Sequence, residues 1–79
     1  MKNPERSILY KEIGYRLRAR RRSQKITLNQ MAEKLGRSRD YVRQAELAKF
    51  RISLDKLYEF CAVLDVAPKA ILPDYMPGS

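Results

Sequence analysis

Two short helices are predicted by the segment TLNQMAEKLGRSRDYVRQAE, residues 27–46. Thr27 and Gln30 have the spacing of a capping box, in which each side chain accepts a hydrogen bond from the other residue's backbone amide. Gly36 tolerates the left-handed conformation that ends many helices, and Ser38 is a favourable N-cap for a second helix. Two short helices joined by a tight turn through glycine form a helix-turn-helix.

The small and aliphatic residues of this segment have the spacing that close packing of two helices requires. Ala32 falls where the first helix approaches the second, so a small side chain is needed there. Val42 fills the space between the helices, and Ala45 is the other expected buried position of the second helix. The remaining residues of the stretch 39–46 are polar, charged or tyrosine, so most of this helix faces solvent or a partner.

Three further helices are predicted around this segment, and no convincing strand pattern is present. The expected fold class is therefore all-α, a compact five-helix bundle over residues 1–72 with a short C-terminal tail over residues 73–79. The signals are the Asn3-Pro4 start and the stripe Leu9, Ile13 and Leu17, the Ser53 cap before the apolar run Leu54, Leu57, Phe60, Cys61 and Leu64, and the prolines Pro68 and Pro73 that bound the last helix.

The positive charge of the chain is concentrated in its middle. The net charge is +8 over 79 residues. Residues 16–51 hold twelve Lys or Arg and three acids, whereas residues 52–79 hold two basic residues and four acids. A concentrated basic region attracts polyanions and is typical of nucleic-acid binding proteins.

Composition also excludes several classes of function. The chain has no histidine and one cysteine, which excludes an intramolecular disulfide, the usual zinc sites and His-dependent catalysis. Cys61 lies in an apolar run and is expected to be a buried packing thiol. There is no apolar stretch of about 20 residues and no signal peptide pattern, so we expect a cytoplasmic protein that does not enter a membrane. We also expect that it binds no cofactor and no small-molecule substrate.

The sequence resembles the Cro and lambda-repressor-like (XRE-type) family of helix-turn-helix regulators from about Ile13 to Leu72. The resemblance implies a five-helix DNA-binding fold with the helix over residues 39–46 in the major groove, and commonly a dimer on a palindromic operator. The matching residues are Ile13-Gly14, Leu17-Arg18, Thr27, Ala32, Leu35-Gly36, Ser38, Tyr41-Val42, Glu46, Ser53-Leu54, Leu57, Leu64-Asp65-Val66 and Ile71-Leu72.

Four outward residues of the second helix are predicted to read bases. Arg39 and Arg43 can pair bidentately with guanine, Gln44 with adenine, and Asp40 can accept from cytosine. The positions that contact bases in the resembled family fall on the same residues. Asp40 has an equally good structural interpretation as a first-turn acid that orients a neighbouring arginine, and the arginines have the alternative of being solvated cations.

Phosphate contacts are predicted around this helix, with capping or solvation as the alternative for each residue. The basic end of the first helix either reaches the flanking DNA backbone or adds only to the long-range field. The predicted phosphate-contacting residues are Thr27, Gln30, Arg37, Ser38, Tyr41, Lys49 and Arg51.

The sequence departs from the family's pattern in two places. Leu28 occupies a position where glutamine is frequent, which removes one expected phosphate contact. Ala48 and Ile52 stand where a glycine and a proline are frequent. Because alanine resists the left-handed conformation, the helix over 39–46 is expected to run longer and the turn to differ. Phe50 is expected to pack on the core, with a partner or sugar contact as the alternative.

Dimerisation is expected because one helix reads only a few base pairs. An apolar patch near the C-terminus is the predicted dimer interface, and the alternative is that its residues cover the core. Its members are Ile71, Leu72, Tyr75 and Met76.

The function that these features predict is that of a small stand-alone transcriptional regulator, a repressor or controller that binds double-stranded DNA sequence-specifically. A separate regulatory protein is a further candidate partner. The alternatives are an antitoxin-like or coactivator-like protein-interaction module of the same fold and a nonspecific nucleic-acid binder. No feature indicates an enzyme, since neither a phosphate loop nor paired carboxylates are present.

Overall fold

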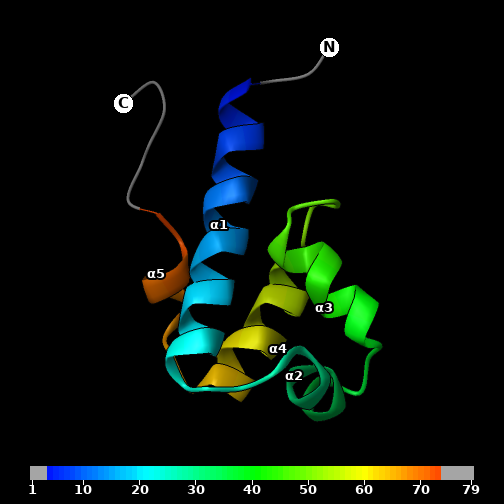
Figure 1. The fold of residues 1–79 in the computed structure, drawn as a ribbon. Helices are drawn as coiled ribbons and strands as arrows, with labels where there is room; N and C mark the ends of the chain where they lie inside the picture. The colour runs from blue at the N-terminus through cyan, green and yellow to red at the C-terminus, as the bar shows by residue number, and fades with distance from the viewer. Residues whose placement is uncertain (1–3, 74–79) are drawn as a thin grey trace.

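The computed structural model describes residues 4–73, with side chains from residue 8 onward, and all regular structure in this range is helical. The expected all-α fold with five helices is confirmed (Figure 1). The helices are α1 (Pro4–Ser23), α2 (Leu28–Leu35), α3 (Arg39–Glu46), α4 (Leu54–Leu64) and α5 (Pro68–Ile71).

The caps of the helix-turn-helix are those that the sequence predicts. The Thr27 hydroxyl accepts from the Gln30 amide at 3.0 Å, and the Gln30 side chain accepts from the Thr27 amide at 2.9 Å. Gly36 ends α2 with φ of 68°, and the Ser38 hydroxyl caps α3 by accepting from the Tyr41 amide. These local bonds fix where α3 begins and therefore in which direction it runs.

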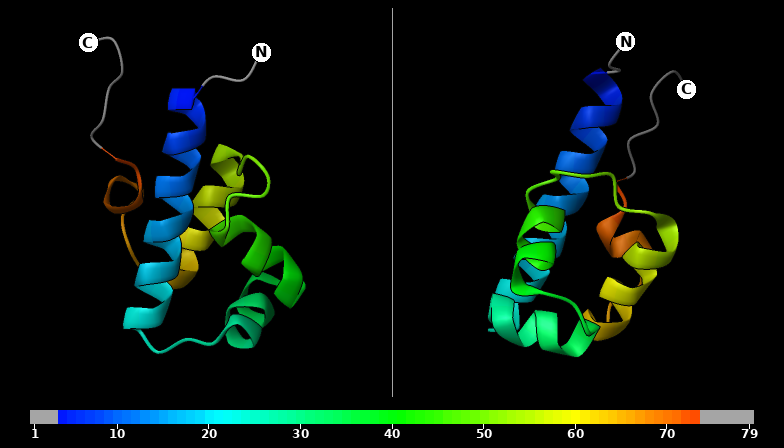
Figure 2. Two further views of the ribbon diagram at one scale, coloured as in Figure 1. Left: turned by 45° about the horizontal axis from the view of Figure 1, so that its top comes forward. Right: turned by 90° about the vertical axis from the view of Figure 1, so that its right-hand side faces the viewer.

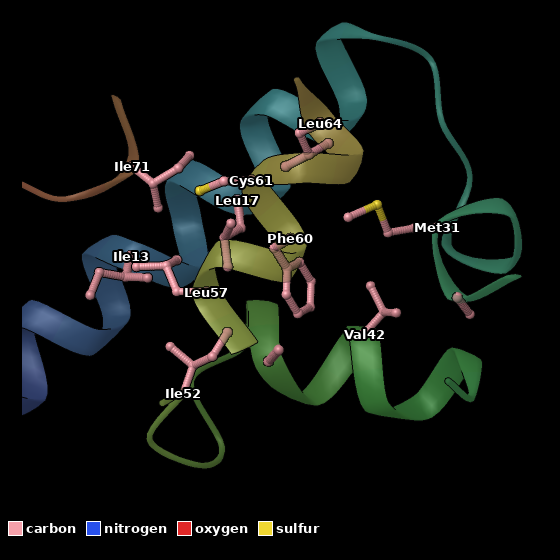
Figure 3. Packing of buried hydrophobic residues seen from close by; sticks show 12 residues of the cluster. Ile13, Leu17, Met31, Val42, Ile52, Leu57, Phe60, Cys61, Leu64 and Ile71 are labelled. Atoms are coloured by element: carbon pink, nitrogen blue, oxygen red, sulfur yellow. The ribbon is translucent and has the colours of Figure 1, made fainter. Parts of the chain in front are cut away.

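One core joins all five helices, and each helix supplies at least one fully buried side chain (Figure 3). Phe60 of α4 lies at its centre. Cys61 is buried beside it, which confirms the packing interpretation, and burial raises the pKa of its thiol. The largest fully buried side chains are Leu17 from α1, Met31 from α2, Val42 from α3, Phe60 and Leu64 from α4, and Ile71 from α5.

The prediction that Ile71 belongs to a dimer interface is wrong. Its side chain is 0% exposed, because the short helix α5 folds back against α1 and α4 and inserts Ile71 into the core. Leu72, the next residue, is half-buried against the same core. Tyr75 and Met76 lie outside the described residues.

The loop after α3 also differs from the expectation. Ala48 adopts the left-handed conformation with φ of 57°, so α3 ends at Glu46 and does not run longer. The Lys49 amide donates to the Gln44 carbonyl at 2.9 Å, which closes the helix end in the way that glycine usually allows. The loop then arches back to α4 (Figure 2) and places Phe50 against the core. The core-packing interpretation of Phe50 is confirmed.

Ser53 occupies the N-cap position of α4, as predicted, but its side chain makes no capping hydrogen bond. Its hydroxyl donates instead to the Asp55 carboxylate. This bond is the largest of the effects that lower the pKa of Asp55.

Candidate nucleic-acid interface

The helix α3 has one buried side and one exposed side. Val42, Ala45 and Glu46 are buried, and they hold the helix against α1 and α2. The four predicted base-contacting residues follow the opposite side, where Arg39, Asp40 and Arg43 are exposed and Gln44 is half-buried. The structure brings these side chains together on one solvent-facing stripe, and their contact with bases stays a prediction.

A buried ion pair fixes the end of α3. The Arg21 guanidinium of α1 donates to both carboxylate oxygens of Glu46, at 2.7 and 3.1 Å, and also to the Ile26 carbonyl at 2.7 Å. The two residues are 7% and 8% exposed. The pair ties α1, the α1–α2 loop and α3 together, so Arg21 acts as a structural residue and not as one of the exposed cations.

Gly14 allows α1 to approach the end of α3 closely, next to this ion pair. A Cβ atom on Gly14 would overlap the Glu46 carbonyl oxygen, and the Ala45 carbonyl lies 3.1 Å from the same point. Only glycine therefore fits where α1 crosses the end of α3. Neither the crossing at Gly14 nor the Arg21–Glu46 ion pair was predicted from the sequence, where Gly14 and Glu46 appeared only among the residues that match the family. The sequence signal that indicates the crossing is a glycine inside an otherwise unbroken helical pattern.

Arg37, in the turn between α2 and α3, is held by its neighbours. Its guanidinium lies 5.0 Å from the centre of the Tyr41 ring and 4.0 Å from a carboxylate oxygen of Glu59. The Tyr41 ring in turn packs against Phe50 and Phe60, with centroid distances of 5.5 and 6.2 Å. Desolvation raises the pKa of Tyr41. Arg37 and Tyr41 are thus held against each other beside the exposed side of α3.

The other predicted phosphate-contacting residues lie at the two ends of the helix-turn-helix. Thr27, Gln30 and Ser38 are exposed, and their oxygens serve as cap acceptors, which leaves the hydroxyl protons and the Gln30 amide protons to donate outward. Lys49 and Arg51 are exposed in the loop after α3. Donors therefore flank α3 on both sides, while the phosphate contacts themselves stay predictions.

Within residues 8–73, ion pairs engage Arg16, Arg21, Arg37 and Lys56, so Arg39 and Arg43 keep unpaired guanidinium groups.

Among the described residues no group of three or more His, Cys, Asp or Glu side chains is arranged to hold a metal ion. In the same range, no helix has both the length and the apolar character needed to span a membrane.

Several solved structures share this fold. The restriction-modification controller protein C.AhdI from Aeromonas hydrophila matches with a TM-score of 0.75 and 25% identity, over 80% of this chain and 96% of that chain. The clp gene regulator ClgR from C. glutamicum matches with a TM-score of 0.77 and 25% identity, over 80% and 82%. The DNA-binding domain of BldD matches with a TM-score of 0.78 and 26% identity, over 85% and 97%.

No curated protein matches the sequence. The helix-turn-helix family HTH_3 matches residues 17–71, which is more than half of the chain and includes α2, α3 and the ion pair that fixes them. The chain therefore belongs to the helix-turn-helix family HTH_3, of the Cro and lambda-repressor-like (XRE) type.

Proposed function

We propose that the chain is a transcriptional regulator that binds double-stranded DNA sequence-specifically, with α3 in the major groove. The observation that carries this proposal is the two-sided character of α3. Its buried side is fixed by a glycine crossing and an ion pair, and its other side presents Arg39, Asp40 and Arg43 to solvent. Such rigid support is what a helix needs to place guanidinium groups against base edges.

The electrostatics support the same placement. The cations that remain unpaired in the described residues include those of α3, and further basic residues follow at the end of α1 and in the loop after α3. The exposed donors at the starts of α2 and α3 flank the recognition stripe, as phosphate contacts that set the register of a helix on DNA would require.

We further propose that the protein binds a palindromic operator as a homodimer, because one recognition helix reads only a few base pairs. Leu72, together with Tyr75 and Met76, remains the proposed contact region, and Ile71 is excluded by its burial. The match with C.AhdI, a restriction-modification controller protein, covers 96% of that controller's chain, which supports the proposal of a regulator. Such a protein would act in the compartment that holds the DNA, which we expect to be the cytoplasm.

The protein-interaction alternative loses its main support. It rested on Phe50 as an apolar residue in a loop that should face DNA. Phe50 is half-buried and packs against Tyr41 and the core, which accounts for its presence without a partner. The proposal of a regulator, and not an enzyme, also agrees with the kind of protein that the matched structures represent.

Selection from a random duplex library at physiological salt, followed by sequencing, tests the proposal. A palindrome with half-sites about one helical turn apart is the expected result. Binding without enrichment would indicate a nonspecific nucleic-acid binder, and absence of binding would contradict the proposed function. Lys69→Ala is the matched control for variants of the α3 arginines, because it removes an exposed cation of α5, which lies across α1 from α3 (Figure 1).

A further inference from the structure

A hollow lined by arginines lies where α1, α2 and α3 meet. Its volume is about 170 Å³, enough for a few water molecules or one phosphate group. It is formed by Arg18 and Arg21 from α1, Leu28 from α2, and Arg43, Glu46 and Leu47 from α3 and its end. Three guanidinium groups and one carboxylate give this hollow a local net charge of +2.

The geometry of α1 directs Arg18 toward α3. Arg18 lies about one turn after Gly14 and about one turn before Arg21, so the three residues share a face of the helix. Gly14 touches the Glu46 carbonyl, and Arg21 binds the Glu46 carboxylate. The backbone at Arg18 is therefore held beside the end of α3 by contacts on both sides of it, and the exposed Arg18 side chain lines the hollow.

The charges around the hollow are not balanced within the described residues. Arg21 is neutralised by Glu46, whereas Arg18 and Arg43 form no ion pair in the part of the chain that the structure describes. Leu28 and Leu47 supply apolar walls and no hydrogen-bonding side-chain atoms. Two unpaired guanidinium groups facing one hollow repel each other, and an anion placed between them would relieve that repulsion.

We propose that this hollow receives one backbone phosphate of bound DNA and that Arg18 is a DNA contact outside the helix-turn-helix. Arg43 lines the hollow and also belongs to the recognition stripe of α3, so the bound phosphate is one beside the base pair that Arg43 reads. Arg20 and Arg22, two and four residues along α1, line no part of this hollow and contribute only to the long-range field. This inference rests on the proposed function.

The test compares Arg18→Ala with Arg20→Ala, which removes the same charge from an exposed position of the same helix. Affinity is measured by fluorescence anisotropy for the selected duplex and for an unrelated duplex, over a series of salt concentrations. For Arg18→Ala we expect a fivefold to tenfold loss, of about the same size on both duplexes, and a salt slope smaller by about 0.9. For Arg20→Ala we expect a change of less than about twofold.

The outcomes separate the two proposals. If the wild-type chain binds and Arg18→Ala changes affinity no more than Arg20→Ala, the contact at Arg18 is overturned and the proposed function stands. If the wild-type chain binds no duplex, both proposals fall. Arg18→Lys is the second variant: it keeps the charge but loses the forked donor geometry, so partial loss supports a direct contact. Full retention by Arg18→Lys together with equal losses for both alanine variants would reduce Arg18 to part of the general field.

Discussion

Removing the carboxylate of Glu46 is expected to destabilise the protein strongly. Glu46→Gln keeps the size of the side chain and one acceptor oxygen, but it leaves the Arg21 guanidinium buried without a counter-ion. Both side chains of the pair are less than a tenth exposed, at 9% and 5%, so solvent cannot screen the unpaired charge. Loss of one partner of a buried pair costs about 3–5 kcal/mol, and the retained acceptor places this variant near the lower value.

The expected effect is large compared with the whole stability of the domain. A chain of this length has a free energy of unfolding of about 4–12 kcal/mol. A loss of about 3 kcal/mol lowers Tm by roughly 12–24 °C, at about 4–8 °C for each kcal/mol in a domain of this size. Urea titration followed by circular dichroism measures the free energy, and a thermal scan measures Tm.

Glu12→Gln provides the matched control. Glu12 pairs with Arg16 one turn along α1, but these side chains are 43% and 35% exposed, so the expected cost is about 0.5 kcal/mol. If Glu46→Gln and Glu12→Gln have the same small effect, the reasoning from burial is refuted. A further check is the double variant Arg21→Met with Glu46→Leu, which removes both charges and should be more stable than Glu46→Gln alone.

Four other substitutions test separate parts of the account. Gly14→Ala should cost about 1–3 kcal/mol in urea titrations, because its Cβ meets backbone atoms of α3. Gly36→Ala, which meets open space and suffers only from its positive φ, should cost less; the reverse order would contradict the crossing at Gly14. Ala48→Gly should stabilise by about 0.5–1 kcal/mol by relieving the left-handed alanine, and unchanged stability would show that no such strain exists. Arg43→Ala should cost about 1–3 kcal/mol on the selected duplex and relax one base preference, whereas a uniform loss on all duplexes would make Arg43 a phosphate contact.

The parts of the fold that depend on local chemistry were predictable from the sequence. The capping box of Thr27 and Gln30, the turn at Gly36 and the cap at Ser38 each involve residues within a few positions of one another. Because their hydrogen bonds join residues that are close in the sequence, the sequence pattern alone predicts where α2 and α3 begin and where α2 ends. The exposed stripe of α3 follows from the same placement.

Helix ends that use residues other than glycine were not predictable in this way. Lys25, Ala48 and Asp65 all adopt positive φ at the ends of α1, α3 and α4. For Ala48 the local preference is unfavourable, and packing of the residues that follow, Phe50 and Ile52, offsets it. Such a balance between local strain and tertiary packing cannot be predicted from the local sequence.

The arginine side chains of α1 show the same limit. The sequence places a cluster of arginines at the end of α1 but does not distinguish them. In the structure Arg21 is buried with Glu46, Arg18 faces the hollow beside α3, and Arg20 is exposed. Their roles depend on the angle at which α1 crosses α3, which Gly14 permits, and that angle is a property of tertiary packing.

The central claim, that α3 reads DNA sequence, is tested most directly by a ratio of affinities. The measurement is the affinity for the selected duplex divided by that for a scrambled duplex of equal length, for the wild-type chain and for the double variant Arg39→Ala, Arg43→Ala. We expect the ratio to fall by about 30-fold or more in the double variant, since two base contacts of about 1–3 kcal/mol each are lost. Lys69→Ala should leave it unchanged. An equal ratio in the wild-type chain and the double variant would contradict the claim.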